Sequence, residues 1–186
     1  MAAGGRQLRG RDPHYTMNRD SVTWISATRV WIPIGAALFI VALIGSALVV
    51  PQLRLLHFLQ ALIYVAVVIL ARRNSMWGIG AGVTIAVVWN SLNLFVTHNM
   101  ERGAEVLWSF LRTGQQAWLV PTPGTFPALV PVMVLLGGIG HFVLITACLA
   151  ALFDQRIEDK KVWKMFAGGG VALLYFALII IVARPR

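Results

Sequence analysis

Five apolar runs, each about as long as a membrane is thick, constrain this chain more than any other feature of its sequence. They extend approximately over residues 30–50, 53–71, 77–96, 128–153 and 163–183. A helix needs roughly 20 apolar residues to cross the hydrocarbon core of a bilayer. We therefore predict an all-α integral membrane protein with five transmembrane helices.

The short breaks between the first three runs predict how the helices are connected. Only Pro51–Gln52 separates the first two runs, and only residues 72–75 separate the second from the third. Connections this short join antiparallel neighbours, so we expect an antiparallel bundle. The second run is the least certain span, because it is short and carries His57 and Gln60. If it did not cross, every later helix would be inverted.

Composition supports a single transmembrane domain over residues 30–183. The chain is 58% hydrophobic and 12% charged, whereas soluble domains are about 45 to 50% apolar and about 25% charged. Cys148 is the one cysteine, which excludes an internal disulfide and a thiolate metal cluster. The net charge of +9 comes from Lys and Arg residues in tails and loops. Contact with lipid headgroups accounts for that pattern, and we expect no nucleic-acid partner.

The distribution of positive residues predicts the orientation in the membrane. Eleven lie on one side, at Arg6, Arg9, Arg11, Arg19, Arg29, Arg72, Arg73, Arg156, Lys160, Lys161 and Lys164; five lie on the other, at Arg54, Arg102, Arg112, Arg184 and Arg186. The positive-inside rule places the N-terminal tail of residues 1–29 in the cytoplasm and the C-terminus outside. Trp31, Trp77 and Trp163 fall at the predicted cytoplasmic edge, where indole rings gather. We predict a bacterial-type inner membrane.

The long loop over residues 97–127 contains an amphipathic segment. Between Glu101 and Arg112, apolar residues recur at helical spacing, at Ala104, Leu107, Trp108 and Leu111. This spacing predicts a helix of about three turns that lies on the outer membrane surface. Two interpretations stay open: a connector at the interface, or a lid over an external cavity.

A histidine near the centre of the fourth span is the first candidate site. Gly137 and Gly138 come four and three residues before His141, so on a helix the imidazole would lie beside a surface without side chains. A buried imidazole must form a hydrogen bond or bind a ligand, because an unpaired polar group is costly in lipid. We expect a bond to a carbonyl, Thr or Asn on a neighbouring helix. The alternative is an axial ligand to haem or another planar pigment.

Polar residues near the outer end of the second and third spans form the second candidate site. His57 and Gln60 lie on the second span, and Asn90, Asn93 and Thr97 recur at i, i+3 and i+7 on the third, with His98 at its end. Since these spans form a hairpin, we expect the groups to meet. They either join the two helices by hydrogen bonds or bind a quinone, a cofactor or a lipid headgroup.

The remaining patterns favour a protein without its own catalysis. No hydrolase or metalloprotease motif is present, and His98 with Glu101 and Glu105 is weak support for acid–base chemistry. Apart from Arg54 and Lys164 at their ends, the spans contain no charged residue, which argues against a proton-coupled or ion-coupled transporter. We expect a membrane subunit that packs against lipids and other membrane subunits. The alternatives are a haem- or quinone-binding redox anchor and a small transporter or lipid carrier.

Overall fold

Helices make up most of the chain that the computed structural model describes, which comprises residues 19–114, 129–153 and 161–183. The first part of the predicted tail, the second part of the long loop, the loop 154–160 and residues 184–186 lie outside the described residues. Two short turns and six α-helices follow one another: α1 (Arg19–Val49), η1 (Pro51–Leu53), α2 (Arg54–Arg72), α3 (Met76–Ser91), η2 (Leu92–Val96), α4 (Asn99–Thr113), α5 (Leu129–Leu152) and α6 (Val162–Val182).

The predicted all-α class is confirmed in these described parts, which contain no strand. Five helices are long and apolar enough to cross a membrane, as a multi-pass protein requires. The predicted third span corresponds to α3 together with η2, a π-helical turn in which the Thr97 amide donates to the Leu92 carbonyl at 2.9 Å. Such π-helical turns are rare and occur frequently at functional sites.

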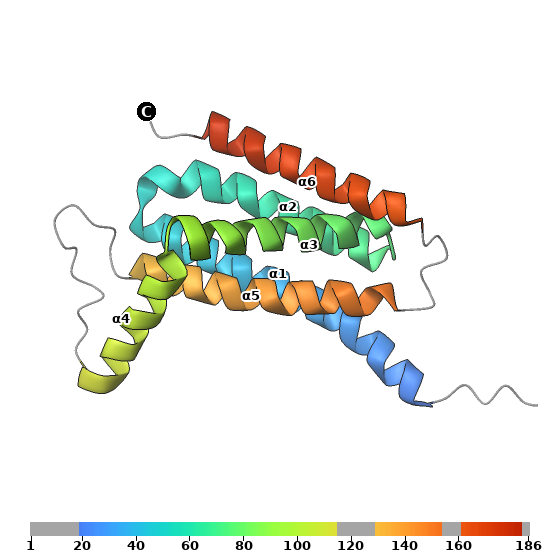
Figure 1. Ribbon diagram of the computed structural model, residues 1–186, viewed down its shortest axis with the longest axis horizontal. Helices are drawn as coiled ribbons and strands as arrows, with labels where there is room; N and C mark the ends of the chain where they lie inside the picture. The colour runs from blue at the N-terminus through green and yellow to red at the C-terminus, as the bar shows by residue number, and fades with distance from the viewer. Residues whose placement is uncertain (1–18, 115–128, 154–160, 184–186) are drawn as a thin grey trace, which may run out of the picture.

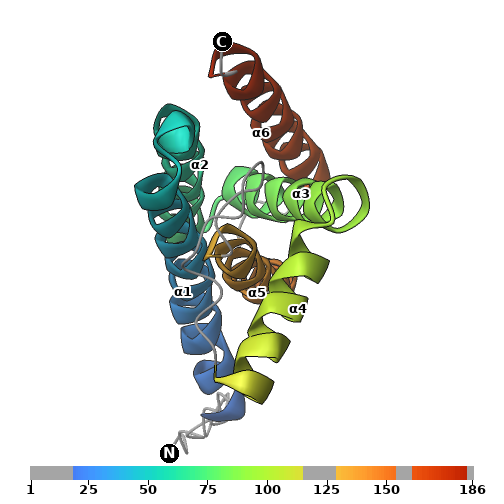
Figure 2. The same cartoon turned by 90° about the vertical axis from the view of Figure 1, so that its left-hand side faces the viewer.

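Helix α5 occupies the middle of the arrangement. It packs against α1, α3 and α4, whereas α6 packs mainly against α3 and touches α2 less extensively. Figure 1 shows the five long helices running lengthwise, with α4 leaving them at a steep angle at one end. Figure 2 shows α5 enclosed by α1, α3 and α4, with α6 at the periphery. A side chain on the covered faces of α5 is therefore surrounded by other helices.

Glycines allow two pairs of helices to approach closely. A Cβ atom added to Gly140 would lie 2.9 Å from the carbonyl oxygen of Gly35, so α1 and α5 meet backbone to backbone. Likewise, a Cβ on Gly80 would overlap the Met165 carbonyl, and one on Gly168 would overlap the Trp77 carbonyl, where α3 meets α6. Close backbone packing replaces the hydrophobic drive that lipid cannot provide.

Helix α4 presents apolar side chains on two sides. Gly103 is buried and Met100 is half-buried, with Met100 next to Gly138 on α5. The apolar residues that predicted this helix face outward instead: Trp108 is 60% exposed and Leu111 is 66% exposed. The helix was predicted correctly, but its contact with α5 uses residues one turn earlier and on another face.

Candidate functional site

His141 lies at the centre of the protein, halfway along α5, and it has no exposed surface. Three aromatic rings surround its imidazole. Phe39 of α1 stacks on it with ring centroids 4.0 Å apart, and Trp89 of α3 meets it edge-on at 4.9 Å. Tyr64 of α2 lies nearly parallel at 5.4 Å. Four helices thus fix the position and tilt of one imidazole.

Both ring nitrogens of His141 form hydrogen bonds. Nε2 lies 2.6 Å from the Tyr64 hydroxyl, and Nδ1 lies 3.0 Å from Oδ1 of Asn90. An amide oxygen only accepts, so Nδ1 carries the proton and donates to Asn90. Nε2 then accepts from the Tyr64 hydroxyl. The opposite tautomer would leave the buried Tyr64 hydroxyl proton without an acceptor among the described residues. The imidazole is neutral in this network.

The surface that Gly137 and Gly138 leave open is filled by other side chains. A Cβ on Gly137 would lie 3.1 Å from the Phe39 ring, and one on Gly138 would lie 2.5 Å from the Met100 methyl. The Phe39 ring and the Met100 thioether therefore occupy the surface that a planar pigment would need. Since both His141 nitrogens are already bonded, ligation of a haem iron would require one of these hydrogen bonds to break.

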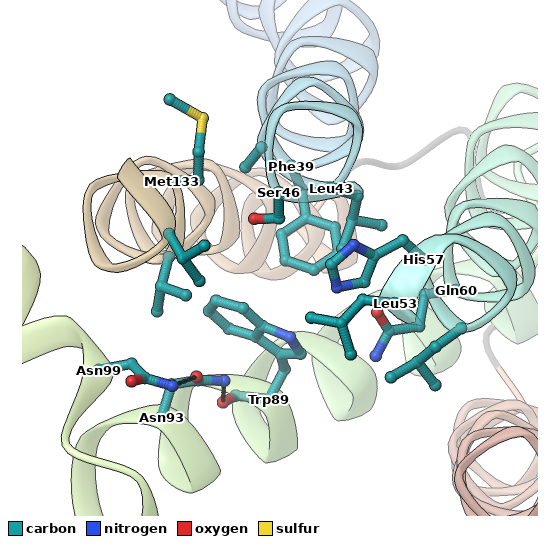
Figure 3. A pocket seen from close by; sticks show the side chains of 14 residues that line it. Phe39, Leu43, Ser46, Leu53, His57, Gln60, Trp89, Asn93, Asn99 and Met133 are labelled. Carbon is teal, nitrogen blue, oxygen red and sulfur yellow. Dashed lines mark hydrogen bonds between the residues drawn. The ribbon is translucent and has the colours of Figure 1, made fainter. Parts of the chain in front are cut away.

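A cavity of about 180 Å³ lies between α1, α2, α3 and α5, toward the end of the bundle where α4 begins. Its lining combines apolar and neutral polar side chains: Phe39, Ala42, Leu43, Ser46, Leu53, Leu56, His57, Gln60, Trp89, Asn93, Asn99, Val130, Met133 and Val134. Figure 3 shows His57 and Gln60 extending from α2 on one side, with Trp89 of α3 across from them. Phe39 and Trp89 belong to this lining and also contact His141. They form the wall between the cavity and the buried imidazole.

Two polar atoms on the cavity lining have no hydrogen-bond partner among the described residues. They are Nδ1 of His57 and Oε1 of Gln60, both inaccessible to solvent. Gln60 as a whole is only 6% exposed. A buried polar atom without a partner costs about 1 to 3 kcal/mol. In native structures such atoms are rare, and each one points to a missing partner or a functional role.

Asn93, in η2, links the end of α3 to α4. Its Nδ2 donates to the Trp89 carbonyl at 3.0 Å, and its Oδ1 accepts from Thr97 Oγ1 at 3.3 Å and Asn99 Nδ2 at 3.4 Å. His98 lies apart from this group: it has a left-handed backbone (φ 53°) and is exposed, with Nδ1 3.5 Å from Glu101. The described residues contain no cluster of three His, Cys, Asp or Glu side chains that could bind a metal ion.

The predicted polar groups therefore separate into two sets. Asn90 turns toward His141, whereas His57, Gln60 and Asn93 line the cavity and His98 lies outside it. Sequence reasoning missed Tyr64, although His57, Gln60 and Tyr64 follow one another at i, i+3 and i+7 on α2. That spacing marks a single polar face directed into the protein. The roles of Phe39 and Trp89 had no comparable pattern, because an apolar side chain in a span gives no sign of whether it packs inside the protein or faces lipid.

Chemically, the cavity can hold a small neutral group beside polar side chains, while both imidazole nitrogens of His141 behind it are already hydrogen-bonded. Comparison of the chain with protein-family models, curated proteins and solved structures finds no match.

Proposed function

We propose that the protein is a non-enzymatic membrane subunit that holds a small neutral molecule, the quinol form of a quinone or the head of a neutral lipid, in the cavity beside His57 and Gln60. The observation that carries this proposal is the pair of buried polar atoms, Nδ1 of His57 and Oε1 of Gln60, for which no described residue supplies a partner. Because both atoms are closed to solvent, the His57 and Gln60 side chains turn toward the cavity when the ligand binds. Hydrogen bonds to the ligand then remove the free-energy cost of leaving the two atoms unpaired.

The lining determines the charge and hydrogen-bonding character of the ligand. Among the described residues, no Asp, Glu, Lys or Arg borders the cavity, so a charged group would enter without a counter-charge at high cost. Oε1 of Gln60 accepts hydrogen bonds, and Nδ1 of His57 accepts or donates according to its tautomer. A hydroxyl group on a flat or compact head satisfies the amide oxygen. The Trp89 indole supplies an apolar surface for the remainder of that head.

The size of the cavity limits what it encloses. Sites for drug-sized molecules usually measure about 300 to 1,000 Å³, whereas this cavity measures about 180 Å³. It therefore encloses a head or a single ring, and the rest of the molecule extends along apolar side chains toward the lipid. A quinol ring and the hydroxyl-bearing head of a neutral lipid both meet these requirements.

The same proposal includes a placement in the membrane. The five spans run antiparallel with the N-terminus in the cytoplasm, which puts the cavity in the outer leaflet and α4 on the outer surface. The exposed Leu107, Trp108 and Leu111 of α4 support an interfacial position, because they would enter the headgroup region. The outward faces of the spans contact lipid and neighbouring subunits. Most Lys and Arg residues lie at the end of the protein that this orientation places in the cytoplasm, as the positive-inside rule expects.

Extraction of bound small molecules tests the proposal. The wild type, the variant His57→Leu/Gln60→Leu and the control Thr146→Val are purified in mild detergent, and their organic extracts are compared by mass spectrometry. Thr146 is exposed and its hydroxyl bonds to the Phe142 carbonyl of its own helix, so the control removes a polar group away from the cavity. We expect a neutral quinone or lipid at close to one molecule per chain in the wild type and the control.

The double variant should lose that molecule while its helix content, measured by circular dichroism, stays unchanged. Equal recovery from the wild type and the double variant would overturn the proposal. A Soret absorbance that disappears on His141→Ala would replace it with the haem-anchor hypothesis.

A further inference from the structure

A second hollow lies between α2, α3 and α6 and shares no lining residue with the cavity. It measures about 370 Å³, and its lining is apolar except for the Tyr175 hydroxyl: Leu62, Ile63, Ala66, Val67, Leu70, Trp77, Ala81, Gly168, Val171, Ala172 and Tyr175. We propose that this groove binds one acyl chain of an anionic phospholipid whose phosphate lies at Arg72 and Arg73.

The dimensions of the groove fit one acyl chain. From Leu62 to Leu70 on α2 it extends for eight residues, or about 12 Å at 1.5 Å per residue. Dividing the volume by this length gives a mean cross-section of about 30 Å². A single hydrocarbon chain lying along α2 matches this narrow, elongated shape.

The ends of the groove place that chain within one leaflet. Leu62 lies close to the middle of the span Pro51–Arg72, so the groove starts near the membrane midplane. There the Tyr175 hydroxyl donates to the Leu59 carbonyl at 2.8 Å, which links α6 to α2. The other end opens at Leu70 and Trp77, beside the connection between α2 and α3. Its length of about 12 Å is most of the half-thickness of about 15 Å of a hydrocarbon core.

Positive charge gathers at this open end. Arg72 and Arg73 are exposed, and neither forms an ion pair with a described residue. Lys164 lies one turn before Gly168, which contacts Trp77, and its Nζ is 6.0 Å from the Trp163 ring. The adjoining sequence 154–161 contains three acidic and three basic residues, so it adds no net negative charge. A phosphate group above an apolar groove matches this arrangement, because guanidinium groups bind phosphate oxygens in pairs.

Lipid binding to the purified full chain tests the inference. Equal amounts of phosphatidylglycerol and phosphatidylcholine with the same acyl chains are added in detergent, and native mass spectrometry measures how much of each stays bound. We expect the wild type to favour phosphatidylglycerol by about tenfold. The variant Arg72→Gln/Arg73→Gln should reduce this preference to less than about twofold. The control Arg54→Gln/Arg102→Gln, which removes two charges at the opposite end, should keep it.

A second variant tests the groove itself. Ala66 lines the groove and is exposed, so Ala66→Trp fills the space without entering the protein core. It should lower the retention of both lipids, and Ala66→Leu should do so to a smaller extent. Circular dichroism confirms that each variant remains helical. An unchanged lipid preference in the arginine variant, or full retention of phosphatidylglycerol in Ala66→Trp, would overturn the inference. Loss of the cavity ligand leaves it unaffected, because the two sites share no lining residue.

Discussion

The substitution Tyr64→Phe isolates the hydrogen bond that holds the central imidazole. It removes one hydroxyl and keeps the ring, which packs against Phe39 with centroids 4.4 Å apart. Nε2 of His141 then loses its donor at a site with no exposed surface. An unsatisfied buried acceptor costs about 1 to 3 kcal/mol. Hydrogen bonds between membrane helices average about 0.6 kcal/mol and reach about 1.7. Because this bond is short and fully buried, we expect Tyr64→Phe to lower the free energy of unfolding by about 1.5 kcal/mol. The unfolding equilibrium constant then rises about tenfold.

Repeating the substitution in a His141→Leu background reverses its sign. The Tyr64 hydroxyl then has no acceptor, so removing it should be neutral or stabilise the protein by up to about 1 kcal/mol. The difference between the two backgrounds is the coupling energy of a double-mutant cycle. Reversible unfolding in mixed detergent micelles measures all four proteins. The reasoning fails if Tyr64→Phe changes the unfolding free energy by less than about 0.3 kcal/mol, or if its cost is the same in both backgrounds.

Three further predictions concern packing and topology. Gly80→Ala should destabilise the protein by about 1 to 3 kcal/mol in the same unfolding assay, because its Cβ would overlap the Met165 carbonyl; Gly170→Ala, with open space around it, should be neutral or stabilising by up to about 1 kcal/mol. Cys148 has no exposed surface, so a maleimide should label it only after unfolding; rapid labelling of the folded protein would contradict its position between α5 and α3. In a Cys148→Ala background, a membrane-impermeant maleimide added outside intact cells should label Thr113→Cys and leave Arg73→Cys unlabelled, and the reverse pattern would invert the proposed orientation.

The sequence predicted the helices well because their cause is local. Twenty apolar residues between charged or helix-breaking segments are sufficient to specify a membrane span, so the predicted spans and the apolar parts of the helices differ by only a few residues. Helix α1 itself begins earlier, at Arg19. The thickness and apolarity of the hydrocarbon core set the boundaries of the spans, so they can be predicted without knowing which helices are neighbours. The helix in the long loop followed in the same way from the spacing of its apolar residues.

The partners of His141 depended on how helices rotate about their axes, which the sequence leaves open. Asn90 and Asn93 were grouped because they are three positions apart on one helix. Asn90 nevertheless bonds to His141, whereas Asn93 lines the cavity. The rotation of α5 is set by close contacts such as Gly140 against Gly35, which join segments about a hundred residues apart. Tyr64 could have been predicted from its spacing to Gln60. The contacts of Phe39 and Trp89 could not, because every apolar residue in a span resembles a lipid-facing one.

The proposed ligand supplies the partners that Nδ1 of His57 and Oε1 of Gln60 lack. It can be looked for in a cryo-electron microscopy map of the wild-type chain in lipid nanodiscs, bound to a rigid antibody fragment for size. We expect a compact non-protein feature in the cavity, within hydrogen-bond distance of both atoms. A map in which these two atoms instead bond to other protein groups, with the cavity closed by side chains, would contradict it.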